Sequence, residues 1–349
     1  MSSCPPPPPL TVLRGHADHV TSLSFGDGVI VSGSADGAII VWDLSIRRPI
    51  LNFQSHDRSV LSICPLPTNS SQVVSAGRDG KIKLWDINYV DKKSTATIEY
   101  NTGAAHFCNT STIGRDLSPI SNINNLIISP INEDDVGIWD IRAREKVGVI
   151  NTKLFGKFGM TSTLLLCENM LLESKGDGAE SCVESTPACI LVGHEDGSLS
   201  IFDLKTLKHL SNTKIHSQQL MGLDISPSKR NLLVTGGADT SIQRSTVITD
   251  IVTNKLQLIE NEKVTLPDEG TSCVKYRSDG RIVASTHWDS TVRLFDSKKM
   301  KPIAILRHHT GSVYVVDFGP KNTIYQSHFA TAGKDNNICV WNTFESTYK

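Results

Sequence analysis

A short pattern that recurs along the chain constrains its fold more than any other feature. Five stretches read alike: SGSADGAIIVWD (32–43), SAGRDGKIKLWD (75–86), VGHEDGSLSIFD (192–203), STHWDSTVRLFD (285–296) and TAGKDNNICVWN (331–342). Alternating apolar and polar residues over such short runs indicate β-strands. The Asp-Gly pairs between them favour tight hairpin turns, which need a positive φ. Each copy is therefore a predicted strand, turn and strand that ends in an aromatic residue.

The spacing inside the pattern exposes two further copies. The turn aspartate precedes the aromatic residue by six positions in all five stretches. The same frame fits TGGADTSIQRST (235–246), where Ser245 replaces the aromatic residue. A seventh copy, EDDVGIWD, ends at Trp139 and Asp140, with a turn that we interpret as one residue shorter. Seven such units, of about four strands each, predict an all-β, seven-bladed β-propeller.

Length and composition set the limits of this interpretation. A chain of 349 residues would ordinarily suggest two domains, but repeats that cannot fold alone favour one. We therefore expect a proline-rich tail over residues 1–9 and a single propeller over 10–349. The formal net charge of −1 argues against a nucleic-acid-coating protein and against a polybasic membrane binder. No secretory signal and no membrane span is predicted, so we expect a cytoplasmic and nuclear protein.

Nothing in the sequence predicts an enzyme, a metal site or a cofactor. The eight cysteines form no C-x-x-C pair, and we expect small buried hydrophobic residues in a reducing compartment. P-loop, zincin and nucleophile-elbow motifs are absent.

The repeats resemble the WD-repeat family over positions 10–349. In that family a His, a Ser or Thr, the turn Asp and the Trp form one buried hydrogen-bonded tetrad in a blade. The resemblance implies such tetrads in blades one, two and seven: His16, Ser32, Asp36 and Trp42; His56, Ser75, Asp79 and Trp85; His309, Thr331, Asp335 and Trp341. Because the set recurs at repeat spacing, we interpret it as structural and not as a catalytic triad. Family geometry also implies that LTVLR (10–14) completes the seventh blade and closes the ring.

Three segments narrow the resemblance to the G-protein-beta-subunit-like protein 1 family, which includes the fungal ASTRA-associated propellers. They are CPPPPPLTVLRG at the start, KFGMTSTLLLCE with ILVGHEDGSLSIFDL, and THWDSTVRLFDSKKMKPIAILRHHTGSV. This likeness implies a non-enzymatic adaptor that works with Tel2–Tti cochaperone components to stabilise PI3-kinase-related kinases, or in an ASTRA-like chromatin-linked complex. No G-protein gamma partner is expected, since no heptad precedes the first strand. No direct nucleic-acid or membrane binding is expected either.

The residue before each turn aspartate is predicted to project from the top face, where partners would bind. The charged or aromatic residues at this position are Arg78, Glu195, Trp288 and Lys334. Tryptophan and arginine are common interface hot spots, so Trp288 is the first candidate. Packing of Trp288 on a neighbouring blade is the alternative.

A second function class stays open at the end of the third unit. Trp139, Asp140, Ile141 and Arg142 resemble the Trp-Asp-x-Arg motif by which some propellers dock onto cullin-RING ubiquitin ligases. The motif is short, and chance matches are common in a chain rich in Trp-Asp pairs.

Two insertions and the tail complete the expectations. Residues 168–187 carry five acids and one base, and we expect a solvated loop or an acidic docking loop between strands at 161–167 and 188–192. Residues 88–118 are expected to be irregular. The proline run 5–9 is expected to be a stiff spacer, with binding to an SH3- or WW-type groove as the alternative.

Overall fold

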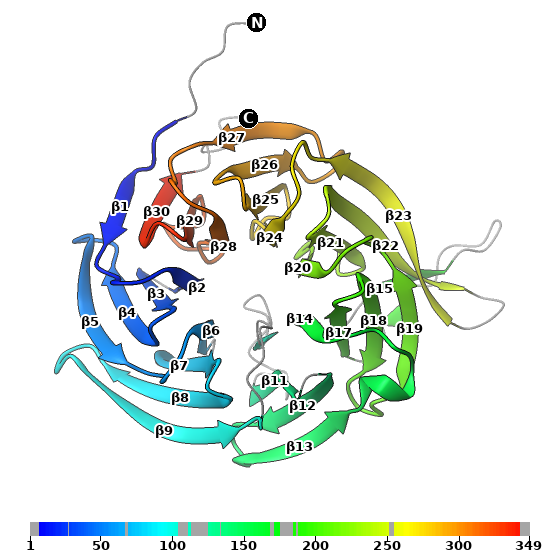
Figure 1. The fold of residues 1–349 in the computed structure, drawn as a ribbon, viewed down its shortest axis with the longest axis horizontal. Helices are drawn as coiled ribbons and strands as arrows, with labels where there is room; N and C mark the ends of the chain where they lie inside the picture. Colours follow the sequence, from blue (N-terminus) through cyan, green and yellow to red (C-terminus); the bar gives the residue numbers. More distant parts are fainter. Residues whose placement is uncertain are drawn as a thin grey trace, which may run out of the picture. The chain divides into compact units, whose positions relative to one another are not determined.

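The chain consists almost wholly of β-strands. The structure, a computed structural model, describes residues 7–26, 28–66, 69–103, 111–112, 125–132, 134–167, 171–174, 184–185, 188–250 and 255–342. Within these ranges the helical assignments are a short 3-10 turn, η2 (Thr152–Leu154), and the single residue Asn125. The strands form seven sheets, drawn in Figure 1. This confirms the predicted all-β, seven-bladed class.

The seven sheets belong to two compact units. The terminal unit comprises residues 1–99 and 272–349, and the central unit comprises residues 100–271. The terminal unit contains four sheets and the central unit three. That residues 10–349 form a single domain stays a prediction.

The first two sheets of the terminal unit follow chain order. Their strands are β2 (Val20–Phe25), β3 (Val29–Ser34), β4 (Ala38–Asp43), β5 (Arg48–Gln54), β6 (Val60–Leu66), β7 (Asn69–Gly77), β8 (Lys81–Asn88) and β9 (Lys93–Asn101). The prediction that residues 88–118 are irregular is wrong in its first half, because β9 occupies part of that stretch. Residues 104–110 and 113–118 lie outside the described residues.

The other two sheets of the terminal unit join the two ends of the chain. Their strands are β24 (Thr271–Tyr276), β25 (Ile282–His287), β26 (Val292–Asp296), β27 (Pro302–Leu306), β28 (Val313–Phe318), β29 (His328–Gly333), β30 (Asn337–Asn342) and β1 (Thr11–Arg14). The N-terminal strand β1 pairs antiparallel with β30, with Thr11 opposite Val340 and Arg14 opposite Asn337. The prediction that residues 10–14 complete the last blade is confirmed.

The central unit repeats the same four-stranded plan. Its strands are β10 (Ser111–Thr112), β11 (Leu126–Ile131), β12 (Asp135–Asp140), β13 (Glu145–Ile150), β14 (Thr161–Cys167), β17 (Cys189–His194), β18 (Ser198–Asp203), β19 (His209–Lys214), β20 (Leu220–Ile225), β21 (Leu232–Gly237), β22 (Ser241–Asp250) and β23 (Lys255–Thr265). Strands β14 and β17 confirm the strands predicted on either side of the insertion 168–187.

The described parts of that insertion are strands and not loop. β15 (Leu171–Ser174) pairs with β16 (Glu184–Ser185), and it also pairs parallel with β22, where Glu173 lies opposite Ile248. The neighbour β21 pairs with β22 only as far as Thr246, so the last residues of β22 offer an edge to β15. The expectation of a loop is therefore wrong at these positions, because an unused strand edge accepts backbone hydrogen bonds. The rest of 168–187 lies outside the described residues.

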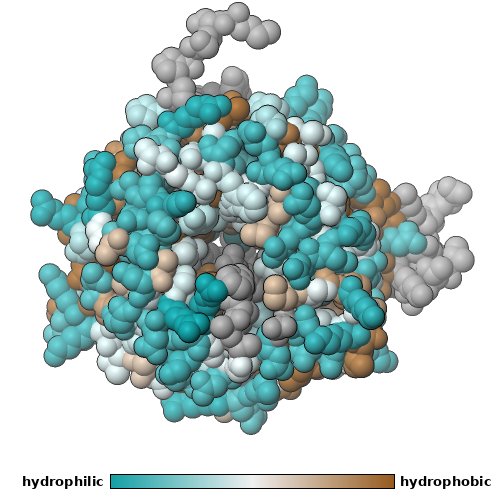
Figure 2. Space-filling model, viewed as in Figure 1, coloured by the Kyte–Doolittle hydropathy of each residue, from teal (hydrophilic) through white to brown (hydrophobic). Residues whose placement is uncertain are grey.

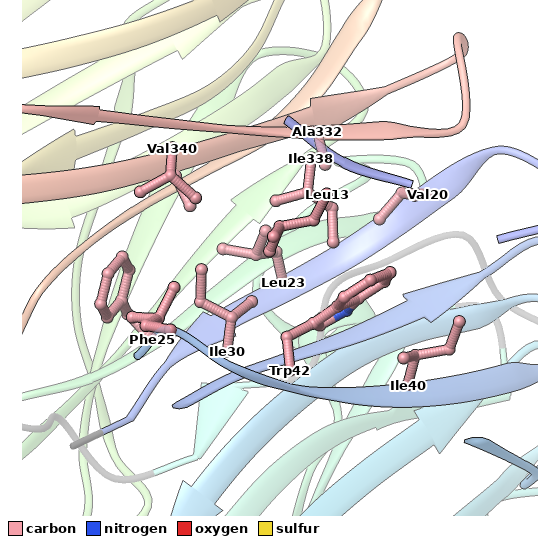
Figure 3. Close-up of a cluster of buried hydrophobic side chains, with 12 residues drawn as sticks. Leu13, Val20, Leu23, Phe25, Ile30, Ile40, Trp42, Ala332, Ile338 and Val340 are labelled. Atoms are coloured by element: carbon pink, nitrogen blue, oxygen red, sulfur yellow. The ribbon is translucent and has the colours of Figure 1, made fainter. Parts of the chain in front are cut away.

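Apolar side chains fill the space between neighbouring sheets of a unit. In the terminal unit one cluster unites β1, the β2–β5 sheet and the β28–β30 strands, as Figure 3 shows for Leu13, Phe25, Trp42 and Val340. Cys167, Cys189, Cys273 and Cys339 are buried in such clusters, as predicted, and Cys64 is half-buried. Cys4, Cys108 and Cys182 lie outside the described residues. Burial raises the pKa of Cys339 to about 12, which keeps its thiol protonated and unreactive.

The backbone is left-handed directly after most of the turn aspartates. Gly37, which follows Asp36, has a φ of 87°, and a Cβ added there would lie 2.0 Å from the carbonyl oxygen of His56. Ser290 and Asn336 take the same place with φ values of 68° and 62°. The predicted positive φ is confirmed at these turns, and glycine is required only where the next sheet approaches closely.

Candidate protein-interaction site

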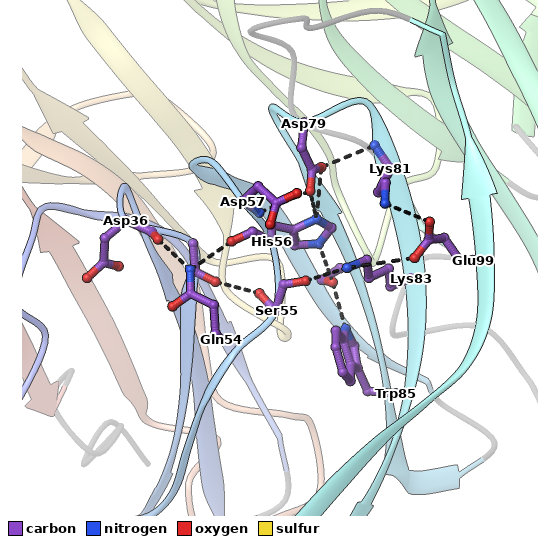
Figure 4. Close-up of polar contacts among 12 residues, drawn as sticks. Asp36, Gln54, Ser55, His56, Asp57, Asp79, Lys81, Lys83, Trp85 and Glu99 are labelled. Atoms are coloured by element: carbon purple, nitrogen blue, oxygen red, sulfur yellow. Dashed lines mark hydrogen bonds and ion pairs between the residues drawn. The ribbon is translucent and has the colours of Figure 1, made fainter.

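The β6–β9 sheet holds a complete tetrad, shown in Figure 4. Nδ1 of His56 lies 2.9 Å from Oδ1 of Asp79, and its Nε2 lies 2.7 Å from Oγ of Ser75. Trp85 donates from Nε1 to the same Ser75 oxygen over 2.9 Å. The carboxylate therefore accepts from Nδ1–H, and Ser75 donates to Nε2. Burial lowers the pKa of His56 against the opposing charge of Asp79, so the ring is neutral at neutral pH.

The last sheet repeats this arrangement. Nδ1 of His309 lies 2.9 Å from Oδ2 of Asp335, and its Nε2 lies 2.9 Å from Oγ1 of Thr331. Trp341 donates to Thr331 over 2.9 Å. Burial alone would raise the pKa of Asp335, but hydrogen bonds and the charge of His309 bring it to about 2.

The predicted tetrad of the β2–β5 sheet is incomplete. Nε2 of His16 lies 2.7 Å from Oγ of Ser32, and Trp42 donates to Ser32 over 2.8 Å. Asp36 does not join them, so this part of the prediction is wrong. Its carboxylate accepts from Oγ of Ser34 and from the backbone of its own turn, and Nδ1 of His16 has no partner among the described residues. Burial therefore lowers the pKa of His16 to about 4.

Two other sheets have a histidine that the sequence analysis did not single out. Nε2 of His287 lies 2.6 Å from Oγ of Ser285, and Nε2 of His194 lies 2.8 Å from Oγ of Ser200. Both histidines stand two residues before a turn aspartate, and this spacing was the available signal. Burial lowers the pKa of each to about 4. A ring from the second strand thus takes the place of the missing loop histidine.

The turn aspartate of the β24–β27 sheet also has a different partner. Asp289 pairs with Nη2 of Arg293 at 2.8 Å, within the same hairpin. Burial alone would raise the pKa of Asp289, but hydrogen bonds from Thr291 and Arg293 bring it below its usual value. A charged pair therefore replaces the contact between histidine and aspartate in this sheet.

The β20–β23 sheet has the hydrogen-bonded histidine, aspartate and threonine of a tetrad but lacks the tryptophan. Nδ1 of His216 lies 3.0 Å from Asp239, and its Nε2 lies 3.0 Å from Oγ1 of Thr235. Ser245 stands at the aromatic position and is buried. The pairing of β22 with β23 shifts register between Arg244 and Ser245, as it does before Trp42 in the first sheet. The bulge of the repeat therefore survives without the tryptophan.

The third copy of the repeat has a turn of ordinary length. Trp139 lies opposite Ile127, just as Trp42 lies opposite Ile30, and twelve residues separate the members of each pair. The interpretation of a shorter turn is wrong, because the aspartates are displaced and the spacing between the strands is unchanged. The position equivalent to Asp36 is Glu133, which lies outside the described residues.

The comparisons with known proteins agree with these tetrads. A family profile described as "WD domain, G-beta repeat" matches residues 7–43, 47–86, 263–296 and 300–342. The chain therefore contains WD repeats. Its matched stretches coincide with the terminal unit almost throughout, where the complete tetrads lie.

Proteins of two names are similar to this chain over most of its length. The WD-repeat protein is 27% identical to mouse "Guanine nucleotide-binding protein subunit beta-like protein 1", over 97% of each chain. It is 26% identical to "ASTRA-associated protein 1" of Verticillium alfalfae, over 89% of this chain and 79% of the relative. The protein of that name from Schizosaccharomyces japonicus is 23% identical, over 97% and 99%.

Three of the predicted partner-binding residues make the same kind of backbone hydrogen bond. The N–H of Arg78 donates to the carbonyl of Ser59 over 2.8 Å, and that of Lys334 donates to Ser312 over 2.8 Å. The N–H of Glu195 donates to Met160 over 2.9 Å. Each side chain therefore starts from a turn that is fixed against the first strand of its own sheet.

Exposure separates these residues. The side chain of Trp288 is 45% exposed, and Lys334 and Glu195 are exposed, whereas Arg78 is half-buried. Oγ of Ser312 donates to the carbonyl of Trp288 over 3.0 Å, which fixes the turn under the indole. The carboxylate of Glu195 accepts from the backbone of Met160 over 3.2 Å, so part of its capacity is used within its own loop. Trp288 and Lys334, both in the terminal unit, are the best-presented pair.

The ligase-docking candidates of the WD-repeat protein form an ordinary turn. Trp139 is 2% exposed, and Oδ1 of Asp140 accepts from the backbone of Arg142 and Ala143 over 2.7 and 3.3 Å. Asp43 and Asp296 hold the equivalent turns of other sheets in the same way. Arg142 is exposed. Docking through this motif stays a prediction.

The described part of the chain lacks two other kinds of feature. No group of three or more His, Cys, Asp or Glu side chains there could hold a metal ion. Among the same residues, no helix has the length and apolarity that a membrane crossing requires. Of the proline run, residues 7–9 are described and form no strand.

Proposed function

We propose that this WD-repeat protein is a non-enzymatic adaptor that holds protein partners on the exposed turns of its sheets. The observation that carries the proposal is Trp288, an indole 45% exposed on a rigid turn. A large exposed ring loses solvent contact at little entropic cost when a partner covers it. Lys334 lies next to the same Ser312 contact and adds a charge to that surface.

The relatives named ASTRA-associated protein 1 support an ASTRA-like complex as the assembly in which the adaptor works. Within it, we propose that the protein works with Tel2–Tti components to stabilise PI3-kinase-related kinases, in the cytoplasm and the nucleus. The fold supplies only the rigid binding surfaces for this role.

Affinity purification with mass spectrometry tests this proposal. The wild-type chain should recover Tel2–Tti proteins and large kinases, and Trp288→Ala should lose most of them without a change in thermal melting. The control is Ile46→Ala, which removes another exposed apolar side chain (57% exposed) from a turn of the same unit. Full recovery by Trp288→Ala would rule out this surface.

The same experiment decides the second candidate function. Arg142 is exposed at the end of a rigid turn, as a docking arginine must be. If the protein is a substrate receptor of a cullin-RING ligase, wild type should recover a cullin adaptor and Arg142→Ala should not. Recovery of the adaptor by both would exclude the motif.

A further inference from the structure

The outer strand β27 presents apolar side chains to solvent. Ile303 is 47% exposed and Ile305 is 37% exposed, and they alternate along the strand with the half-buried Ala304. Other large exposed hydrophobic residues of the terminal unit, such as Ile46 and Val90, lie in turns and not on an edge strand. Figure 2 shows hydrophobic atoms among hydrophilic ones at the margin where β27 runs.

The segment around β27 carries several positive charges and no negative charge. Residues 297–309 contain no acid, and four exposed cations flank the two isoleucines: Lys298, Lys299, Lys301 and Arg307. The nearest carboxylate in the sequence, Asp296, accepts hydrogen bonds from the backbone of Lys298 and Lys299 over 3.1 and 3.0 Å. Those bonds fix the turn that presents the lysines. In a chain of net charge −1, this concentration of positive charge is local.

β27 is also the last strand of its sheet among the described residues, in the order β24-β25-β26-β27. A strand at an edge offers unpaired N–H and C=O groups to an added strand. Lysines on such an edge repel a second copy of the same edge, and they attract a strand of opposite charge. Pro302 stands at the first position, where a missing N–H is tolerated.

We propose that β27 is the docking edge for an extended acidic segment of a protein partner, which adds to the sheet as a further strand. Apolar residues at every second position of that segment cover Ile303 and Ile305, and its carboxylates face the four cations. Main-chain hydrogen bonds supply affinity and the alternation supplies selectivity. This site is separate from the Trp288 surface and does not depend on the proposed adaptor role.

A synthetic peptide of alternating Val and Glu, labelled with a fluorophore, is the probe. It should bind the full chain in fluorescence polarisation, and binding should weaken as salt rises. The matched control peptide carries N-methyl groups on alternate residues, which remove backbone donors and keep charge and side chains. It should bind at least about tenfold more weakly, a loss of about 1.4 kcal/mol. Equal binding of both peptides, or binding of neither, would overturn the proposal.

Substitutions locate the site. Ile303→Lys and Lys299→Glu should each weaken binding of the Val-Glu peptide by about tenfold, through lost apolar contact and through charge reversal. Ile46→Lys is the matched control, because it changes an isoleucine that is exposed to a similar degree, 57% against 47%, but lies in a turn, and it should bind as wild type does. Unchanged affinity in both β27 variants would contradict the assignment.

Hydrogen exchange and vesicles separate the remaining outcomes. The bound peptide should slow exchange of amides in β27 and leave those of β13 unchanged. β13 also exposes apolar side chains, Val147 and Val149, but carries Glu145 beside them. Protection at β13 in place of β27 would overturn the proposal. So would binding to vesicles of anionic phospholipid with no binding to the peptide, since a membrane would then be the ligand.

Discussion

The terminal and central units use the same sheet with different anchors. Two sheets of the terminal unit have a full tetrad of histidine, aspartate, hydroxyl and tryptophan, and the family profile matches all four of its sheets. The central unit has His216 with Asp239 but no ring, a ring at Trp139 with no histidine bonded to it among the described residues, and His194 bonded to a serine.

The difference teaches which feature of the repeat is essential for the sheet. The bulge before the aromatic position persists at Ser245, where neither ring nor ring hydrogen bond exists. Strand register therefore follows from the alternation of buried and exposed residues, which a shift of one residue would reverse. The tetrad is an added polar anchor, and we expect its loss to lower stability without changing the fold.

Removal of residues 1–15 should give the largest effect, and it should fall on the terminal unit. The deletion removes β1 and buried Leu13, and it exposes the edge of β30. We expect a loss of about 5 kcal/mol, since one buried leucine alone contributes ~2–5 kcal/mol. Thermal melting with hydrogen exchange measures this, and protection should fall first in β28–β30. Unchanged melting would show that β1 does not hold the terminal unit closed.

Substitutions at the aromatic position of the repeat should give the next largest effect. Each one places in one unit the residue type that the other unit has there. Trp85 is 7% exposed and packs against Phe53, with ring centroids 4.9 Å apart. Trp85→Ser should cost about 3–5 kcal/mol in denaturant unfolding. Ser245→Trp should cost about 1–3 kcal/mol, because the β20–β23 sheet has packed without a ring. A gain in stability from Ser245→Trp would mean that the space for the ring is still present.

Loss of the loop histidine should affect both units alike. His56→Ala and His216→Ala leave the carboxylates of Asp79 and Asp239 largely buried without the ring partner. We expect about 2–3 kcal/mol for each in urea unfolding. His19→Ala, at a side chain 40% exposed, is the control and should change little. A much smaller loss in His216→Ala would show that the hydrogen-bonded histidine, aspartate and threonine need the tryptophan to stabilise their sheet.

Acidification should reveal the histidines whose pKa values burial lowers furthest. His16, His194 and His287 have pKa values lowered to about 4 by burial. The unfolded chain binds protons near pH 6.5 and the folded chain does not, so stability falls as pH drops from 6.5 to 4. Each group contributes at most about 1.4 kcal/mol per pH unit. Unfolding at pH 7 and pH 5 should show a weaker pH dependence in His287→Gln than in wild type.

The aspartates do not offset this loss. The pKa values of Asp239 and Asp335 are about 2, so the stability that they add is present above pH 3.8 and is lost only as pH falls through 2. If His287→Gln has the same pH dependence as wild type, burial of that ring is not the cause.

Sequence reasoning succeeded where the signal is local and repeated. The aromatic positions and the left-handed turns follow from spacing and alternation, and the pairing of β1 with β30 was implied by the resemblance to the WD-repeat family. It failed to predict the hydrogen-bond partners of Asp36, His194 and His287, because several possible partners lie within a few ångströms of each side chain. It also missed the strand at Leu171–Ser174, because that strand pairs with the end of β22, about 75 residues away, and it missed Glu184–Ser185, which pairs with Leu171–Ser174 in turn.

By itself the sequence determined seven sheets, each of strands that alternate buried and exposed residues. It also determined one position in each sheet, directly before the turn aspartate, that is a candidate for partner binding. The alternation of apolar and polar residues and the turn aspartate both lie within about a dozen residues, so they can be recognised without knowledge of tertiary contacts. Only the tertiary structure decided which histidine bonds to an aspartate and which carboxylate is spent inside a turn. It also decided which apolar residues of β27 remain in water. These outcomes depend on competition for burial and hydrogen bonds between segments far apart in the chain, and spacing along the sequence does not contain that information.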